Sequence, residues 1–155
     1  MARQKGHRRD TRVREAAPAR YAQDRKEAQL TGVLYDSDVI IEILRGRLEV
    51  TQDARALEAS GVPTYCTPIS TAEIYAGIRP GEEGLAMAFL RSRGELILDG
   101  TVGRRAGNYL AKYTTSHGVQ IADALIAAAA STTGLALWTL NKRHYPMPDL
   151  DFYEP

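Results

Sequence analysis

The sequence predicts an α/β fold in which a mostly parallel sheet is flanked by helices. Short apolar or β-branched segments alternate with segments of helical periodicity, and this alternation makes each helix a crossover between parallel strands. The chain has 155 residues, of which 44% are hydrophobic and 25% charged. This size and composition suit one domain with a substantial core.

The first half of the chain opens with an apolar strand, residues 32–36, that ends at Asp36. A helix is expected from Val39 to Leu44, with Ser37 or Asp38 as its N-cap. Glycine, proline and charged residues separate the elements that follow. These are predicted helices at 51–59, 70–78 and 82–91 and a predicted strand at 64–67.

The second half continues the alternation. The segment "GELILDG" indicates a short strand, and the residues from Val102 to Ser116 indicate a long helix. The segment "VQIADALIAAAASTTG" predicts an alanine-rich helix that Gly134 ends, and "LALWTL" predicts a last strand. Because apolar residues occur on every side of the alanine-rich helix, we expect it to be buried nearly all round.

Positive charge is concentrated in residues 1–32. This segment holds nine Lys or Arg against four Asp or Glu, whereas the remaining residues hold eleven against fifteen. It also has few large apolar residues, so we expect a basic N-terminal extension that is disordered, followed by the folded domain at 33–155. A solvated arm and an arm that touches RNA are both compatible with this composition.

The composition also narrows the class of protein. One cysteine, Cys66, allows no disulfide within the chain, and the longest apolar run, Ala124 to Ala130, is too short to span a membrane. The charged N-terminus lacks the apolar stretch of a secretory signal. We therefore expect a cytoplasmic protein with no membrane partner.

Three acidic residues are predicted at the same edge of the sheet. Asp36 ends the first strand, Glu73 lies in the first turn of the helix after the second strand, and Asp123 opens the alanine-rich helix. Ligands of open α/β sheets bind beyond the carboxyl ends of the strands, so these side chains are expected in one cleft. Helix capping is the alternative role: Asp36 or Asp38 as an N-cap, Ser70 with Glu73 as a capping box, and Asp123 through its charge at a helix N-terminus.

A divalent cation would compensate these acids. Asp123 in particular lies in a strongly apolar helix, where an isolated carboxylate is costly. Several hard oxygen ligands suit Mg²⁺ or Mn²⁺, whereas one cysteine and three scattered histidines disfavour a zinc site.

The end of the last strand adds polar side chains beside the predicted cleft. Thr139 and Asn141 could orient a water or a phosphate oxygen, and Lys142 and Arg143 could contact a nucleic-acid backbone. Arg79 is a further candidate for RNA binding. The alternative is that the segment after Thr139 is an ordinary polar loop.

Four segments follow one another in the order of the sequence blocks of a known family: "YDSDVIIEIL", "ISTAEIYAGI", "IADALIAAAA" and "WTLNKRHYPM". Asp36 precedes Glu73 by 37 residues, and Glu73 precedes Asp123 by 50. The chain therefore resembles the PIN-domain ribonucleases, and most of all the VapC-type toxins of VapBC toxin–antitoxin pairs. The resemblance covers Val33 to about Leu150. It implies a PIN-like three-layer sandwich.

The resemblance also implies roles for individual residues. Asp36, Glu73 and Asp123 match the acids that bind the catalytic metal in this family. Thr139 and Asn141 match the T-x-N/D block, where some PIN domains have a fourth acid. Asn141 is therefore expected in the catalytic set, but as an amide it would hold a second metal more weakly.

Other positions are less specific. Ser37 matches a small residue that follows the first acid. Asp38 falls where such toxins commonly have Asn, Ser or Asp, and His144 stands where many relatives have Asp, so the roles of Asp38 and His144 are open. RNA binding is expected at Ser37, Thr139, Lys142, Arg143 and Arg79.

The activity implied by the resemblance is that of a metal-dependent endoribonuclease, the toxin of a type II toxin–antitoxin pair. It would hydrolyse RNA phosphodiester bonds with a water activated by Mg²⁺ or Mn²⁺. The implied partners are RNA, a cognate VapB-type antitoxin and a second copy of the chain in a homodimer. The apolar faces at 39–44 and 74–78 could form a groove for the antitoxin, or could simply pack in the core.

Two other functions compete with this one. A non-catalytic PIN-like module that binds RNA or protein is the alternative, and Asn141 in place of a fourth acid supports it. A nucleotide-binding α/β module is disfavoured, because no glycine-rich phosphate loop follows any predicted strand.

Overall fold

A computed structural model describes residues 31–155, which contain a sheet of four parallel strands in the order β3-β2-β1-β4. In β1, Val33 lies opposite Thr64 of β2 and Ala136 of β4. The predicted mostly parallel sheet is confirmed. Residues 1–30 of the predicted basic extension lie outside the described residues. The strands are β1 (Val33–Tyr35), β2 (Thr64–Cys66), β3 (Gly94–Glu95) and β4 (Ala136–Trp138).

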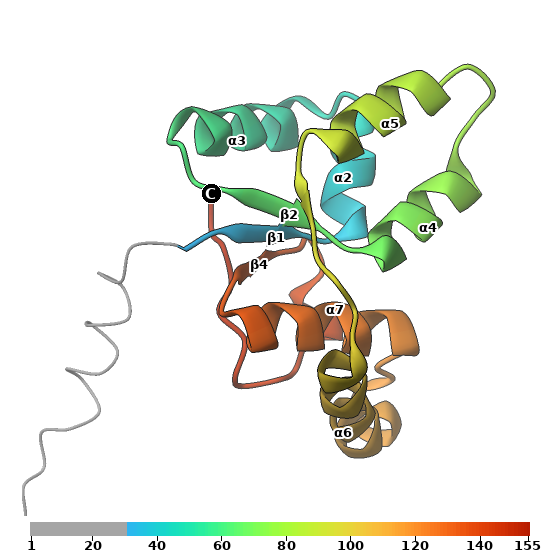
Figure 1. The fold of residues 1–155 in the computed structure, drawn as a ribbon, viewed down its shortest axis with the longest axis vertical. Helices are drawn as coiled ribbons and strands as arrows, with labels where there is room; N and C mark the ends of the chain where they lie inside the picture. Colours follow the sequence, from blue (N-terminus) through green and yellow to red (C-terminus); the bar gives the residue numbers. More distant parts are fainter. Residues whose placement is uncertain (1–30) are drawn as a thin grey trace, which may run out of the picture.

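Helices cover both faces of this sheet and produce the predicted three layers (Figure 1). One layer contains α2 (Ser37–Leu44), α3 (Leu48–Ala59), α4 (Pro68–Gly77) and α5 (Glu83–Arg91). The other contains α6 (Gly100–His117) and α7 (Ile121–Thr133), and a short 3₁₀ helix, η1 (Lys142–His144), follows β4.

The side chains of β1 explain why two separate cores form. Leu34 packs with α6 and α7, whereas Val33 and Tyr35 pack with the helices of the opposite layer. Successive residues of a strand point to opposite faces, so a strand covered on both sides must be apolar throughout. This is why the segment before Asp36 has no polar residue.

The alanine-rich helix α7 is buried as expected. Ala124, Ala127, Ala128 and Ala130 have no exposed surface, and Ile126 is also buried. Small side chains on most of its faces let α7 approach both the sheet and α6 closely, and α6 packs along it. The chain then turns at Gly134, whose φ of 69° places it in the left-handed region that favours glycine at a helix end.

The predicted starts of α2, α3, α4 and α6 each lie two or three residues too late. Asp36 is the N-cap of α2, which confirms the alternative capping role given for it and makes the expectation of Ser37 or Asp38 as the cap wrong. The helix α4 begins at Pro68 with Thr67 as its N-cap, so Ser70 and Glu73 form no capping box. Proline at the first helical position gives up no hydrogen bond, and this moves the start two residues upstream of the predicted one.

The start of α4 matters for the position of Glu73. Thr67 Oγ1 accepts a hydrogen bond of 3.2 Å from the backbone N–H of Ser70, and both side chains are fully buried. Glu73 therefore lies in the second turn of α4 rather than the first. It is free of a capping role.

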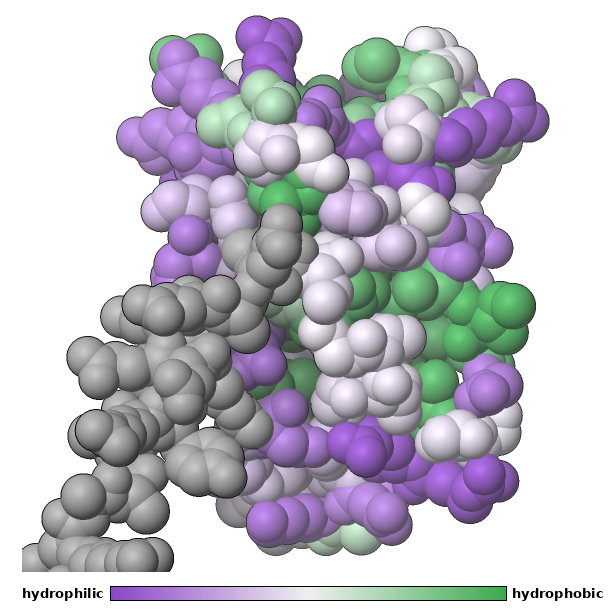
Figure 2. All heavy atoms as spheres, turned by 60° about the vertical axis from the view of Figure 1, so that its left-hand side comes forward, coloured by the Kyte–Doolittle hydropathy of each residue, from purple (hydrophilic) through white to green (hydrophobic). Residues whose placement is uncertain are grey.

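On the face of the protein shown in Figure 2, hydrophilic and hydrophobic residues are distributed according to the layers of the fold. Figure 2 shows hydrophilic residues gathered over the two helical layers, with hydrophobic side chains between them at mid-height. Among residues 31–155, no helix is long and apolar enough to cross a membrane.

Candidate active site

The candidate site lies where the carboxyl ends of β1 and β4 meet the start of α2. Asp36 follows β1 directly, and its backbone N–H donates to the carbonyl of Trp138 at the end of β4, at 2.9 Å. Ser37 then begins α2, and Thr139 follows β4. The parallel register thus brings the first and the last strand of the fold to one edge, as the sequence predicted.

Asp36 is held firmly at this edge. Its side chain is buried, with 8% of the residue exposed. Its Oδ1 accepts a hydrogen bond of 2.7 Å from the backbone N–H of Ser37, and its Oδ2 accepts one of 2.8 Å from the Tyr145 hydroxyl. Burial raises the pKa of Asp36, the hydrogen bonds from Tyr145 and Ser37 oppose this, and the charge of Glu73 adds to it.

Asp38 orders the segment that follows β4. Its Oδ2 accepts hydrogen bonds from the backbone N–H of Leu140 at 3.0 Å and from the Thr139 hydroxyl at 3.3 Å. Its Oδ1 is buried and has no hydrogen-bond partner. Burial, and after it the charge of Asp36, raises the pKa of Asp38 to about 6. The sequence did not indicate this contact between the start of α2 and the end of β4.

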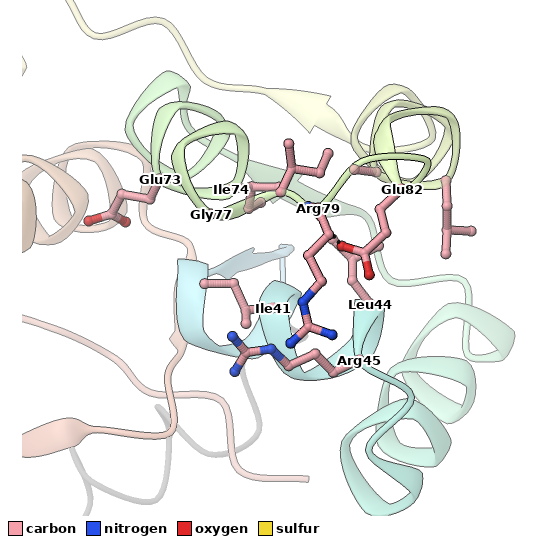
Figure 3. A pocket seen from close by; sticks show the side chains of 11 residues that line it. Ile41, Leu44, Arg45, Glu73, Ile74, Gly77, Arg79 and Glu82 are labelled. Carbon is pink, nitrogen blue, oxygen red and sulfur yellow. Dashed lines mark hydrogen bonds between the residues drawn. The ribbon is translucent and has the colours of Figure 1, made fainter.

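Glu73 reaches the site from α4 through a hydroxyl. The Ser37 Oγ donates a hydrogen bond to Glu73 Oε2, so Ser37 links the acid on α4 to the N-terminus of α2. Figure 3 shows Glu73 at one end of a groove, with its carboxylate directed away from Arg79. Ser37, which was predicted to contact RNA, is thus a partner of the second predicted metal ligand.

Asp123 lies at the N-terminus of α7, opposite η1. Its Oδ2 accepts a hydrogen bond of 3.0 Å from the backbone N–H of Gln120, in a capping box. Its Oδ1 lies 3.8 Å from Nδ1 of His144. The Asn141 amide Nδ2 lies 3.0 Å from Nε2 of the same ring. The capping role and the position in the site therefore occur together.

Tyr145 is a buried residue at this site to which the sequence analysis gave no role. Its ring is buried in the core formed with α6 and α7, and its hydroxyl donates to Asp36. Burial, and after it the charge of Asp36 and the hydrogen bond to it, raises the pKa of Tyr145 well above its ordinary value. The hydroxyl stays protonated and remains a donor. The available signal was a tyrosine, rather than an entirely apolar side chain, at a core position after a polar loop.

The residues predicted to bind RNA differ in their surroundings. Thr139 is buried, its hydroxyl donates to Asp38, and its Oγ1 accepts from the backbone N–H of Asn141. Lys142 forms an ion pair with Glu154. Arg143 and Arg79 are exposed.

The surroundings of the acidic side chains bear on whether this site can hold a divalent cation. Among residues 31–155, no Lys or Arg forms an ion pair with Asp36, Asp38 or Glu73. The unpartnered, buried Oδ1 of Asp38 is an oxygen that a hard cation would satisfy. In their present side-chain conformations, no three acidic, histidine or cysteine side chains of the described part converge on one point. Carboxylate oxygens are the chemical type of ligand that Mg²⁺ and Mn²⁺ prefer, and a cation held by three of these acids would require their side chains to move.

Replacing Asp38 by asparagine should stabilise the cation-free protein at pH 7. The pKa of Asp38 is about 6 in the folded protein and ~4 in the unfolded chain. The contribution of this group to the free energy of unfolding is therefore fully present below pH ~4 and is lost as the pH rises towards 6, because the folded protein must then hold a buried charge. Asparagine keeps the acceptor for Leu140 and removes the charge. We expect a gain of about 1–2 kcal/mol at pH 7 and little gain near pH 4.5, measured by urea unfolding in EDTA.

The matched control is Glu95→Gln, which removes an exposed carboxylate from β3. It should leave the unfolding free energy nearly unchanged at both pH values. An Asp38→Asn protein that is less stable than wild type at pH 7 would contradict the account of an uncompensated acid.

Comparison with known proteins identifies the family of this chain. The profile of the PIN domain family matches residues 33–150. Ribonuclease VapC10 of Mycobacterium tuberculosis is 35% identical over 116 residues, which are 74% of this chain and 86% of that protein. Ribonuclease VapC19 of the same organism is 30% identical over 119 residues, 76% of this chain and 95% of that protein.

Solved structures share the fold. A toxin–antitoxin complex from Klebsiella pneumoniae superimposes with a TM-score of 0.64 at 23% identity, over 80% of this chain and 100% of that one. VapBC2 from Rickettsia felis, bound to a DNA fragment from its promoter, gives a TM-score of 0.65 at 17% identity, over 78% and 96% of the two chains. With the profile match and the 35% identical relative, these findings show that the chain belongs to the PIN-domain family and to the VapC group within it.

Proposed function

We propose that this protein is an endoribonuclease, that it acts as the toxin of a VapBC-type toxin–antitoxin pair, and that its activity depends on Mg²⁺ or Mn²⁺. The observation that supports this most is the set of acids at one sheet edge: Asp36 and Asp38 after β1, Glu73 from α4 and Asp123 from α7. In residues 31–155 none of the first three has a Lys or Arg ion-pair partner. Asp36 is buried and Asp38 has a buried, unpartnered oxygen, so uncompensated charge on these two acids is costly, and a bound cation would compensate it.

The acids have separable tasks in this proposal. Asp36, Glu73 and Asp123 would hold the cation, and Ser37 keeps Glu73 beside Asp36. A bound Mg²⁺ or Mn²⁺ supplies Lewis acidity that activates water and neutralises charge on the phosphodiester in the transition state. Asp38 holds the Leu140 backbone through Oδ2, and so fixes the loop from which Asn141 and His144 project, while its unpartnered Oδ1 would be available to the cation. Asn141, in the catalytic set, would contact the scissile phosphate through its amide.

RNA would approach over the exposed side of this loop. Without a cation, the four carboxylates repel phosphate, so binding needs positive charge at the rim. Arg143 and Arg79 are exposed and suited to backbone contacts. Lys142 is partly neutralised by Glu154, and the buried Thr139 acts through Asp38 and Asn141 instead of through direct contact.

The direct test is cleavage of RNA by the purified protein in Mg²⁺, in Mn²⁺ and in EDTA. Cleavage that EDTA stops and added cation restores is the expected result. Cleavage that is indifferent to EDTA would contradict the cation dependence. Tight RNA binding with no cleavage under any of these conditions would instead support the non-catalytic module.

The antitoxin would bind in the groove between α2, α4 and α5, next to Glu73. The groove has an apolar floor and charged ends, and Figure 3 shows the side chains of Arg45 and Arg79 lying together beside Ile41. An amphipathic segment with apolar side chains for the floor and acidic ones for these arginines fits this lining. Its floor and walls are Ile41, Leu44, Ile74, Gly77, Ile78, Leu85 and Ala86. A homodimer, implied by the family resemblance, stays a prediction.

Leu85→Glu should weaken binding of the cognate antitoxin at least about tenfold, because it places a charge on the apolar wall of the groove. Leu85 is 62% exposed, so the substitution should not disturb the fold. Leu48→Glu is the matched control, since Leu48 on α3 is 68% exposed and does not line the groove. Equal affinity of the two variants in a titration would exclude the groove as the antitoxin site.

A further inference from the structure

Tyr145 forms a buried contact between the loop after β4 and the first acid of the site. Tyr145 is 4% exposed, and its hydroxyl donates a hydrogen bond of 2.8 Å to Oδ2 of Asp36, which lies 109 residues earlier in the sequence. The backbone N–H of Tyr145 donates to the carbonyl of Lys142 at 2.9 Å, which closes the 3₁₀ turn. The packing of the ring and the backbone hydrogen bond therefore fix the position of the Tyr145 hydroxyl independently of its hydrogen bond to Asp36.

The Asp36 carboxylate is held from two sides. Ser37 N–H donates to Oδ1 and the Tyr145 hydroxyl donates to Oδ2, so rotation about the last side-chain bond would break a hydrogen bond in either direction. A carboxylate oxygen can accept more than one hydrogen bond or ligand, so these two hydrogen bonds do not exhaust the acceptor capacity of Asp36. The carboxylate is oriented and still able to bind.

We propose that Tyr145 is a positioning residue, whose hydroxyl holds the Asp36 carboxylate in the orientation that binds the divalent cation. This inference rests on the proposed function of the site. Groups that hydrogen-bond to metal ligands fix their orientation, and their loss typically costs about 10–100-fold in metal affinity.

A packing role alone does not account for the hydroxyl. Phenylalanine would fill nearly the same core volume, and the Tyr145 hydroxyl adds a hydrogen bond of 2.8 Å to Asp36 Oδ2. Asp36 is the hydrogen-bond partner of the Tyr145 hydroxyl, and it is a buried acid without an ion-pair partner among Lys and Arg of the described residues. Tyr145 therefore packs in the core through its ring and orients the Asp36 carboxylate through its hydroxyl.

The test is the affinity of the full-length protein for Mn²⁺, measured by calorimetric titration without RNA. Tyr145→Phe should bind Mn²⁺ about tenfold more weakly than wild type. Tyr109→Phe is the matched control, because Tyr109 is also buried and its hydroxyl donates to Asp149, with Ser131 as its other hydrogen-bond partner, away from the site. It should change the affinity less than about twofold. An unchanged affinity in Tyr145→Phe, or an equal loss in both variants, would overturn the proposal.

A second measurement uses the wild-type protein and does not depend on the folding of a variant. With tyrosines labelled with ¹³C at the ring carbon that bears the hydroxyl, Mg²⁺ should shift the signal of Tyr145 and leave that of Tyr109 in place. A Tyr145 signal that does not respond while Mg²⁺ binds would refute the role. If wild type binds neither cation, the proposed function fails along with this inference. If wild type binds Mn²⁺ and Tyr145→Phe binds it with the same affinity, the inference fails alone.

Discussion

Asp36→Asn and Asp123→Asn are each expected to lower the rate of RNA cleavage at least about a thousandfold, because each removes a charged oxygen ligand worth several kcal/mol of transition-state stabilisation. The fold should persist. An asparagine at position 36 can still accept from Ser37 or Tyr145, and one at position 123 can still accept from Gln120. The measurement is the cleavage rate in Mg²⁺, with thermal unfolding of the same samples as the check on folding.

The control for this prediction is Asp53→Asn. Asp53 lies on α3, in the helical layer but away from the carboxyl ends of β1 and β4 (Figure 1). Its replacement should leave the cleavage rate within about twofold of wild type. Cleavage that survives Asp36→Asn and Asp123→Asn would remove both acids from the reaction and place the active site elsewhere on the protein.

Thr67→Val is expected to have the largest effect on stability, lowering the unfolding free energy by about 2 kcal/mol. Thr67 has no exposed surface, and its hydroxyl oxygen is the acceptor for the buried backbone N–H of Ser70 at the start of α4. Valine has the same shape without the oxygen, so it leaves that donor unsatisfied. The melting temperature should fall by about 5–10 °C.

Thr67→Ser separates the cap from the packing, because serine keeps the hydroxyl and loses only a methyl group. It should cost less than about 1 kcal/mol. Equal melting temperatures for the valine and serine variants would show that the hydrogen bond to Ser70 contributes nothing measurable.

The parts of the fold that local pattern determines were predictable. The apolar run before Asp36, the alanine-rich helix and the glycine at its end are determined by residues close together in the sequence, and the structure confirms all three. Helix starts were harder, since Pro68 and Thr67 together begin α4 earlier than apolar periodicity indicates. The choice between capping and catalysis for Glu73 depended on that start.

The organisation of the site depends on contacts that no local pattern contains. Asp38 meets Leu140 across 102 positions, and Tyr145 meets Asp36 across 109. Lys142 appears in the sequence as a free cation because its partner, Glu154, approaches only after the C-terminal segment folds back along β4. Such pairs follow from the register of parallel strands, which the sequence predicts only in outline.

The most direct measurement of the central claim is anomalous diffraction from crystals of the protein grown with Mn²⁺. We expect an anomalous peak bound by Asp36 and Asp123, with Glu73 on the same ion directly or through a bridging water. Crystals that contain Mn²⁺ but show an anomalous peak only at another place on the protein, or no peak beside Asp36, would contradict the claim that these acids form one cation-binding site.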